Sequence, residues 1–239
     1  DLHSFPTRRS SDLVLMPTTT PRQKRDRIQA LGRGHVELVM EGATYDQASK
    51  AAARFAENNG RILVPAFNDP RTAAGQGTAI AEAVEQLGFV PDVVILPVGG
   101  GGLMSGAAAW LRTHHPQVRI IGVEPDGAPC VAAAISAGRP FPLNNIDTFV
   151  DGAAVSLVGD YTFGVINEAK IELTRIPEGQ VCSEMLDMYQ TDGIIAEPAG
   201  ALAAAALPTG GVGSRVHIPG GSRVLSVVSG GNNDVARQY

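Results

Sequence analysis

The chain has 239 residues, 44% of them hydrophobic and 18% charged, and it can therefore bury the core of one large or two small domains. Its 24 acidic and 19 basic residues give a net charge of −5, and the basic residues form no long stripe, so no nucleic-acid partner is expected. Two cysteines, Cys130 and Cys182, provide neither a disulfide framework nor a zinc site. These features are typical of a protein of the reducing cytoplasm.

Both ends of the sequence have unusual features. Residues 1–13 (DLHSFPTRRSSDL) have no apolar period and lack the apolar core of a signal peptide. They match the translation of one reading frame of a common sequencing-library adapter, and we interpret them as a non-native extension. The sequence stops at Tyr239, directly after a glycine-asparagine turn. We expect a chain truncated at both ends, with the remnant of a small α/β domain at residues 14–65 and a larger domain at residues 66–239.

From Val14 onward, apolar runs of strand length alternate with segments of helical period. This order predicts an α/β protein with a largely parallel sheet. The first part predicts strands at residues 14–16, 35–40 and 62–64 and a helix at 21–31. A second helix is expected between a capping box, Thr44 with Gln47, and Gly60, and a third at residues 72–87.

The second part opens with Val93-Val94-Ile95-Leu96, which is apolar on both faces, as a central parallel strand must be. The uncharged stretch that begins here contains Pro97 and five glycines up to Leu111, a composition that argues against a membrane span. Further along the chain, the patterns predict helices at 105–113, 178–191 and 198–207, a strand at 119–124 and a last buried strand at 223–228.

Four consecutive glycines, Gly99 to Gly102, lie between the central strand and the next helix. Glycines allow successive backbone amides to approach phosphate oxygens closely, and the helix N-terminus adds a partial positive charge. A phosphate-containing ligand is therefore expected. No lysine follows as a Walker loop requires, but Gly100, Gly102 and Glu124 approximate a dinucleotide-binding fingerprint, so spacing alone leaves a nicotinamide oxidoreductase open.

Four segments together resemble one known family. The segments PVGGGGL (97–103), TFVDGAAV (148–155), GIIAEPAGA (193–201) and SGGNND (229–234) are similar to the tryptophan-synthase-β-like pyridoxal-phosphate enzymes, and within them to the threonine ammonia-lyase branch. The resemblance runs from about Val14 to the end. It implies fold type II, a three-layer α/β/α arrangement around a parallel sheet, with pyridoxal 5'-phosphate as cofactor.

The resemblance also implies roles for single residues. The cofactor phosphate is expected on the backbone amides of Gly99, Gly100, Gly101, Gly102 and Leu103. Ser229 is expected to face the pyridine nitrogen, where a neutral hydroxyl makes the ring a weaker electron sink than a carboxylate would.

Two acidic positions are open to other readings. Glu197 is expected mainly to favour the start of a helix, with an active-site role as the alternative, and Asp151-Gly152 either borders the ring or forms a turn.

Some relatives hold a divalent cation after the strand that ends at Glu124. Here Glu124 and Ala128 match, but Cys130 replaces the aspartate, so no metal is expected.

The implied reaction is β-elimination from L-threonine to 2-oxobutanoate and ammonia, the first step of isoleucine biosynthesis. The resemblance implies that its Schiff-base lysine lies upstream of this fragment, and none of Lys24, Lys50 and Lys170 has the buried surroundings that such a lysine needs. We therefore assign no catalytic residue and expect the fragment to be inactive. The intact enzyme is expected to be a homo-oligomer, a tetramer in the family, that acts on a small amino acid. Alternatives are a related serine/threonine dehydratase or racemase, a dinucleotide-binding oxidoreductase, and a non-catalytic binding module.

Overall fold

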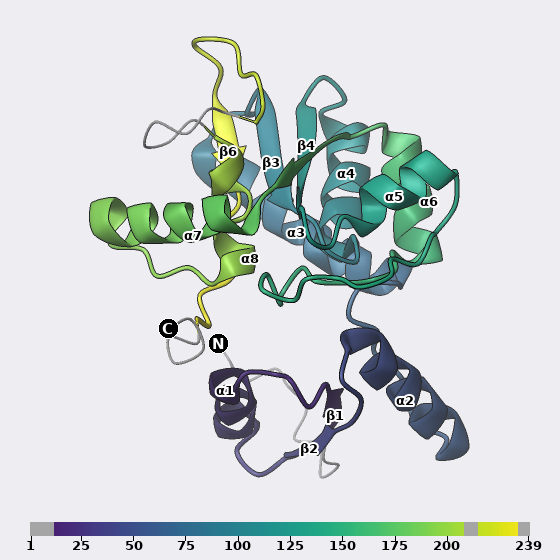
Figure 1. The fold of residues 1–239 in the computed structure, drawn as a ribbon. Helices are drawn as coiled ribbons and strands as arrows, with labels where there is room; N and C mark the ends of the chain where they lie inside the picture. The colour runs from purple at the N-terminus through teal and green to yellow at the C-terminus, as the bar shows by residue number, and fades with distance from the viewer. Residues whose placement is uncertain (1–11, 208–214, 234–239) are drawn as a thin grey trace. The chain divides into compact units, whose positions relative to one another are not determined.

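The computed structural model describes residues 12–207 and 215–233 (Figure 1). They divide into two compact units, residues 12–63 and Val64–Asn233, each with its own parallel sheet. Residues 1–11 and 234–239 lie outside the described part of the chain, and so does most of the predicted extension. Within the described ranges, no helix is long and apolar enough to cross a bilayer.

The smaller unit contains a two-stranded parallel sheet of β1 (Asp12–Met16) and β2 (Val36–Met40), connected by α1 (Arg22–Gly32) and followed by α2 (Tyr45–Asn58). Strand β1 begins two residues before the predicted start, so Asp12 and Leu13 of the segment that we set aside belong to a strand.

The predicted capping box is present in a modified form at the start of α2. Thr44 Oγ1 accepts the amide of Gln47 at 3.4 Å, and Gln47 Oε1 accepts the amide of Ala43 at 2.7 Å instead of that of Thr44. The strand predicted at residues 62–64 is wrong. Ile62 and Val64 are 85% and 81% exposed, and this segment pairs with no strand of the described chain.

The larger unit has a four-stranded parallel sheet in the order β5-β4-β3-β6, which confirms the predicted α/β class. The strands are β3 (Val93–Pro97), β4 (Arg119–Pro125), β5 (Glu172–Ile176) and β6 (Val224–Ser226). Strand β3 is central and buried throughout, as its apolar sequence predicts, and pairs with β4 from Val93↔Arg119 onward and with β6 from Val93↔Val224 onward.

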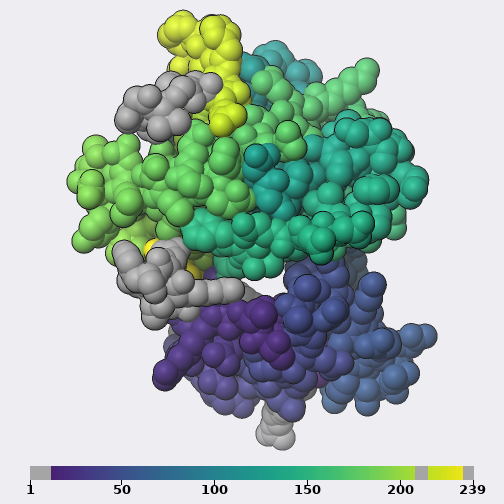
Figure 2. Space-filling view, viewed as in Figure 1, coloured from purple at the N-terminus to yellow at the C-terminus, as the bar shows by residue number. Residues whose placement is uncertain are grey.

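Alternate residues of the central strands supply two hydrophobic cores, because successive side chains point to opposite faces of a sheet. Val94 and Leu96 pack with residues of α3 (Pro70–Leu87), α4 (Gly102–His114), α5 (Cys130–Ala137) and α6 (Asp160–Ala169). Val93 and Ile95 pack with α7 (Glu178–Asp187), α8 (Pro198–Ala201) and the short turn at Ala204–Ala206. The sheet thus has helices on both faces, which confirms the three-layer arrangement (Figure 1). Figure 2 shows the same view in space-filling form, with the residues of the larger unit in blue-teal, green and yellow.

In the larger unit, two helices and one strand differ from the sequence prediction. The helix expected at 178–191 becomes a π-helical turn at Met188–Asp192 before the left-handed Gly193 ends it, and the helix expected at 198–207 is interrupted after Ala201. The last strand is not buried, since Val224 is 38% exposed. Among the described strands, β6 pairs only with β3. Its apolar sequence therefore predicted a strand correctly but its burial wrongly.

Helices α3 and α4 cross at a pair of glycines that allow the two backbones to touch. A Cβ on Gly106 would lie 2.0 Å from the carbonyl oxygen of Ala73 and 2.6 Å from the amide nitrogen of Gly77. A Cβ on Gly77 would in turn lie 2.8 Å from the carbonyl oxygen of Gly106. This crossing determines how closely α4, which begins at the glycine loop, can lie against α3.

We predict that Gly106→Ala destabilises the chain by about 2 kcal/mol or more, because the added methyl group collides with backbone that cannot rotate away. Gly75→Ala in α3 is the matched control, since no atom lies within 4 Å of the added Cβ, and it should stabilise by about 0.5–1 kcal/mol. Urea unfolding of the three proteins measures both effects. Equal stability of Gly106→Ala and the parent chain would contradict the close crossing.

Candidate functional site

The glycine loop lies at the carboxyl edge of the larger unit's sheet. It follows β3 directly, and its last glycine, Gly102, is the first residue of α4. Strand β6 runs parallel to β3, with Ser226 opposite Ile95, so Ser229 leaves the sheet at the same edge. The carboxyl edge of a parallel α/β sheet is where ligands bind in such folds. The topology therefore brings two of the predicted site segments to one edge.

None of the four loop glycines has space for a side chain. A Cβ on Gly100 would lie 2.4 Å from the ring of Phe67, and one on Gly99 would lie 2.9 Å from the Cα of Ala153. Gly101 has a φ of +88°, a backbone conformation that side chains disfavour. Phe67 was missed by sequence analysis, because its contact with the loop joins residues more than thirty positions apart.

The backbone amides of the loop have no acceptor within the described chain. None of the residues from Gly99 to Leu103 donates its amide to another described group. The carbonyl oxygens of Gly101 and Gly102 are bonded, however, to the amide of Ser105 at 2.8 Å and to its hydroxyl at 3.0 Å. Amides that have no acceptor among the described residues, at the N-terminus of a thirteen-residue helix, are suited to bind an anion.

Ser229 and Glu197 lie together where α8 begins. The hydroxyl of Ser229 donates to the carbonyl oxygen of Ala199 at 3.3 Å, and the amide of Glu197 donates to the carbonyl oxygen of Gly230 at 3.0 Å. A Cβ on Gly200 would lie 2.1 Å from that same carbonyl oxygen. The turn after β6 is thus packed against the start of α8.

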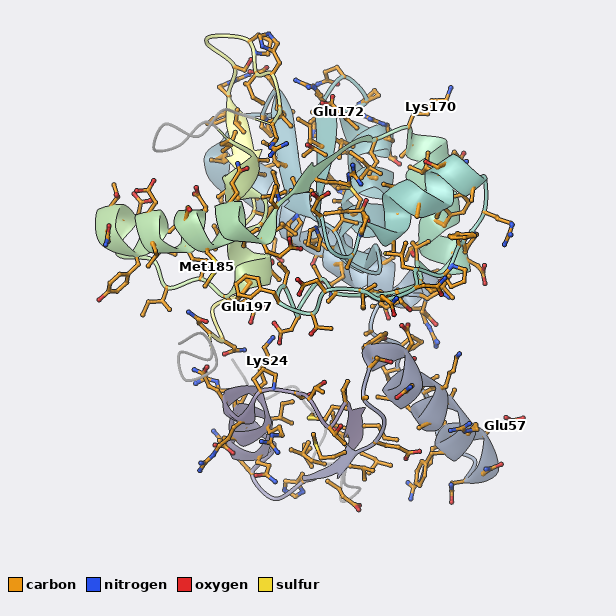
Figure 3. The ribbon with its side chains drawn as sticks, in the orientation of Figure 1. Lys24, Glu57, Lys170, Glu172, Met185 and Glu197 are labelled. Carbon is orange, nitrogen blue, oxygen red and sulfur yellow. The ribbon has the colours of Figure 1, made fainter. Side chains whose placement is uncertain are left out.

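The carboxylate of Glu197 lies between two glycines. Its Oε1 is 2.6 Å from the position of a Cβ on Gly230 and 3.0 Å from that of a Cβ on Gly152. Figure 3 shows Glu197 beside the start of α8, where its side chain makes no capping hydrogen bond. We expected the charge of Glu197 mainly to favour the start of a helix, and Glu197 is the N-cap residue of α8. Its carboxylate also lies between the segment that contains Asp151 and the Ser229 turn, so its active-site role remains a proposal.

Glu124 is buried behind the glycine loop. Its carboxylate accepts the amides of Val131 at 2.7 Å and Ala132 at 2.9 Å, at the first turn of α5, and its side chain is 0% exposed. Burial raises the pKa of Glu124 to about 7, against the opposing effect of these bonds and of Arg175. Both carboxylate oxygens of Glu124 therefore accept hydrogen bonds from the backbone of α5. Within the described ranges, no cluster of three His, Cys, Asp or Glu side chains could hold a metal.

Comparison with known proteins identifies the family. Residues 13–230 match the family described as pyridoxal-phosphate dependent enzymes. The chain is 46% identical over 226 residues to the biosynthetic L-threonine dehydratase IlvA of Mycobacterium tuberculosis, a match that covers 94% of this chain and 51% of the relative. The corresponding protein of Bacillus subtilis is 39% identical, with 94% and 52% covered. The chain thus spans about half the length of these curated relatives.

Solved structures show the same similarity. The processed form of threonine deaminase isoform 2 from Solanum lycopersicum superposes with a TM-score of 0.79 at 34% identity, covering 95% of this chain and 64% of that one. Maize serine racemase superposes with a TM-score of 0.81 at 28% identity, with 95% and 68% covered. The fold is therefore that of fold type II pyridoxal-phosphate enzymes.

The buried carboxyl of Glu124 should make stability depend on pH. Because its pKa in the folded chain lies above the ordinary value of 4.5, it stabilises the fold fully below about pH 4.5 and loses this contribution as the pH rises to 7. The free energy of unfolding, measured by urea at several pH values relative to Glu124→Gln, should fall by up to about 3 kcal/mol over this window. A difference that is the same at every pH would contradict the raised pKa.

Proposed function

The chain belongs to the family of pyridoxal-phosphate-dependent enzymes, and we propose that it is part of an ammonia-lyase that converts L-threonine to 2-oxobutanoate and ammonia. The observation that carries the proposal is the row of amides at Gly99–Leu103 that have no acceptor in the described part of the chain, at the same sheet edge as Ser229. The names and 37–46% identities of the curated relatives support threonine as substrate.

The loop fits the phosphate of the cofactor. Backbone amides at a helix N-terminus bind a phosphate dianion through charge-assisted hydrogen bonds, and the close contacts of Gly99 and Gly100 keep side chains out of the loop. Gly99, Gly100, Gly101, Gly102 and Leu103 would hold the phosphate.

Ser229 would hold the other end of the cofactor at the ring nitrogen. Bound pyridoxal phosphate supplies an electron sink for the α-carbon of the amino acid. The hydroxyl of Ser229 is neutral and rotates about its C–O bond, so the proton that it donates to Ala199 at 3.3 Å could be donated to a ring nitrogen instead. A hydroxyl leaves that nitrogen largely uncharged, which suits rapid loss of the β-hydroxyl over a long-lived carbanion.

A serine/threonine dehydratase or racemase is the second candidate. The superposition with maize serine racemase supports it, but at 28% identity against 46% for the threonine dehydratase relative. The dinucleotide alternative loses its acidic group, because the carboxylate of Glu124 is buried and bonded to two amides of α5. Isoleucine biosynthesis in the cytoplasm is the process that we propose, with a homo-oligomeric intact enzyme.

We propose that none of the three lysines forms the covalent link to the cofactor. Lys170 follows α6 and precedes β5, so it lies at the amino edge of the sheet, opposite the glycine loop, and its side chain is exposed (Figure 3). Lys24 and Lys50 belong to the smaller unit, on α1 and α2. We therefore propose that the catalytic lysine lies in a part of the enzyme outside this chain.

We predict that residues 14–239, expressed alone, release no 2-oxobutanoate from threonine. Borohydride reduction in the presence of pyridoxal phosphate should label no lysine stoichiometrically, because the only lysine of the larger unit, Lys170, lies at the amino edge of its sheet, and Lys24 and Lys50 lie on helices of the other unit. Mass spectrometry of the peptides that contain Lys24, Lys50 and Lys170 measures this. Stoichiometric labelling of one of them together with product formation would overturn the assignment.

The longer protein encoded by the source gene should release 2-oxobutanoate from L-threonine. Gly100→Ala in that protein should lower kcat/KM by about 100-fold or more, because the methyl group would collide with Phe67 and displace the loop. Gly164→Ala in α6 is the control, since no atom lies within 4 Å of its added Cβ, and activity should be retained. Conversion of L-serine to D-serine without deamination of threonine would favour the racemase.

A further inference from the structure

Two side chains hold the carbonyl oxygens of the glycine loop from behind. The hydroxyl of Thr162 donates to the carbonyl oxygen of Gly100 at 2.8 Å, and the thiol of Cys130 donates to that of Gly99 at 3.4 Å. Thr162 is 62 residues further along the chain than Gly100, and Cys130 is 31 residues beyond Gly99. Neither contact belongs to regular secondary structure, so each depends on that one side chain.

These contacts determine the direction of two amides. A peptide group is planar and trans, so its carbonyl oxygen and the next amide hydrogen point to opposite sides. Fixing the carbonyl of Gly99 toward Cys130 directs the amide of Gly100 away from that side chain. Fixing the carbonyl of Gly100 toward Thr162 does the same for the amide of Gly101. Both amides belong to the row that donates to no other described residue.

Burial makes the two donors hard to replace. Thr162 and Cys130 are both 0% exposed, so water cannot readily take over their hydrogen bonds when the side chains are shortened. Thr162 also contacts the carbonyl oxygen of Gly159 at 3.2 Å, but its contact with Gly100 is shorter. A peptide plane that loses its partner here would be free to rotate, because glycine allows many backbone conformations.

Each donor lies in the first turn of a helix whose start is itself fixed. The start of α6 is held where Asn68 Oδ1 accepts the amide of Tyr161 at 3.0 Å. The start of α5 is held by Glu124, which accepts the amides of the two residues after Cys130. The hydroxyl and the thiol are thus attached to rigid supports and not to mobile loops.

We propose that Thr162 and Cys130 are positioning residues that direct the amides of Gly100 and Gly101 toward the phosphate of the cofactor. This inference rests on the proposed function and adds to it two residues that never touch the ligand. The hydrogen bond of Thr162 is expected to contribute more than that of Cys130, because a hydroxyl is a better donor than a thiol and the Thr162 bond is shorter.

The test compares two ligands that differ only in the phosphate. Pyridoxine 5'-phosphate and pyridoxine lack the aldehyde, so neither reacts with surface lysines. Equilibrium dialysis against the 239-residue chain gives both dissociation constants, and their ratio measures the contribution of the phosphate. Because both ligands are measured on the same preparation, a partial loss of folded protein cancels in the ratio. Thermal unfolding of each variant is recorded alongside.

Thr162→Val keeps the shape of the side chain and removes the donor. We expect it to reduce the ratio by about tenfold, equivalent to about 1.4 kcal/mol, with little change for pyridoxine. Thr162→Ser keeps the hydroxyl and should restore most of the ratio. Thr113→Val removes a hydroxyl that donates to Ala109 at the far end of α4, and it should leave the ratio unchanged. Cys130→Ala should reduce the ratio by about threefold, and Cys130→Ser should restore it.

The outcomes separate this inference from the proposed function. A parent chain that binds both ligands equally, or neither, would overturn the phosphate site and the inference with it. A parent chain that prefers pyridoxine 5'-phosphate, with an unchanged ratio in Thr162→Val, would overturn the inference alone. Equal weakening of both ligands in Thr162→Val, without rescue by Thr162→Ser, would show a merely structural role and would also overturn it.

Discussion

The orientation of the peptide groups between Gly99 and Leu103 is the constraint on which the proposed site depends. Amides can face a ligand only if the carbonyl oxygens of the same peptide groups are satisfied on the other side. Ser105 serves the carbonyls of Gly101 and Gly102, while side chains of α5 and α6 serve the two before them. The loop therefore needs three separate elements around it before its amides are available.

Close backbone contacts bring these elements near enough. Helix α4 can approach α3 because Gly77 and Gly106 have no side chains, and the ring of Phe67 can cover the loop because Gly100 has none. The same holds on the other side of the proposed site, where the carboxylate of Glu197 occupies the space beside Gly152 and Gly230. Glycine here provides space for neighbouring groups as well as backbone freedom, which explains why each site segment contains at least one.

Glu124 supports the glycine loop indirectly, through the start of α5 and Cys130. The resemblance led us to compare Glu124 and Cys130 with a glutamate and an aspartate that can hold a divalent cation. In this chain Cys130 replaces that aspartate, and the glutamate instead accepts two amides at the start of α5. The two hydrogen bonds from α5 to Glu124 thus fix the start of this helix. They fix with it the thiol of Cys130, which contacts the loop. The buried carboxyl with its raised pKa is a consequence of this arrangement.

The sequence by itself determined the class of fold, the central strand and the position of the glycine loop, because these depend on local patterns. Four apolar residues before four glycines predict a buried strand followed by an anion-binding loop wherever they occur. The last strand was expected to be buried and is not, since burial depends on how many neighbours a strand has in the sheet. The segment at residues 62–64 was expected to be a strand for the same apolar character and is exposed. The partners of the loop, Phe67, Thr162 and the thiol of Cys130, were decided only by the tertiary structure. A contact between residues 31 to 62 positions apart leaves no periodic signal in a sequence, because it arises from the packing of whole elements.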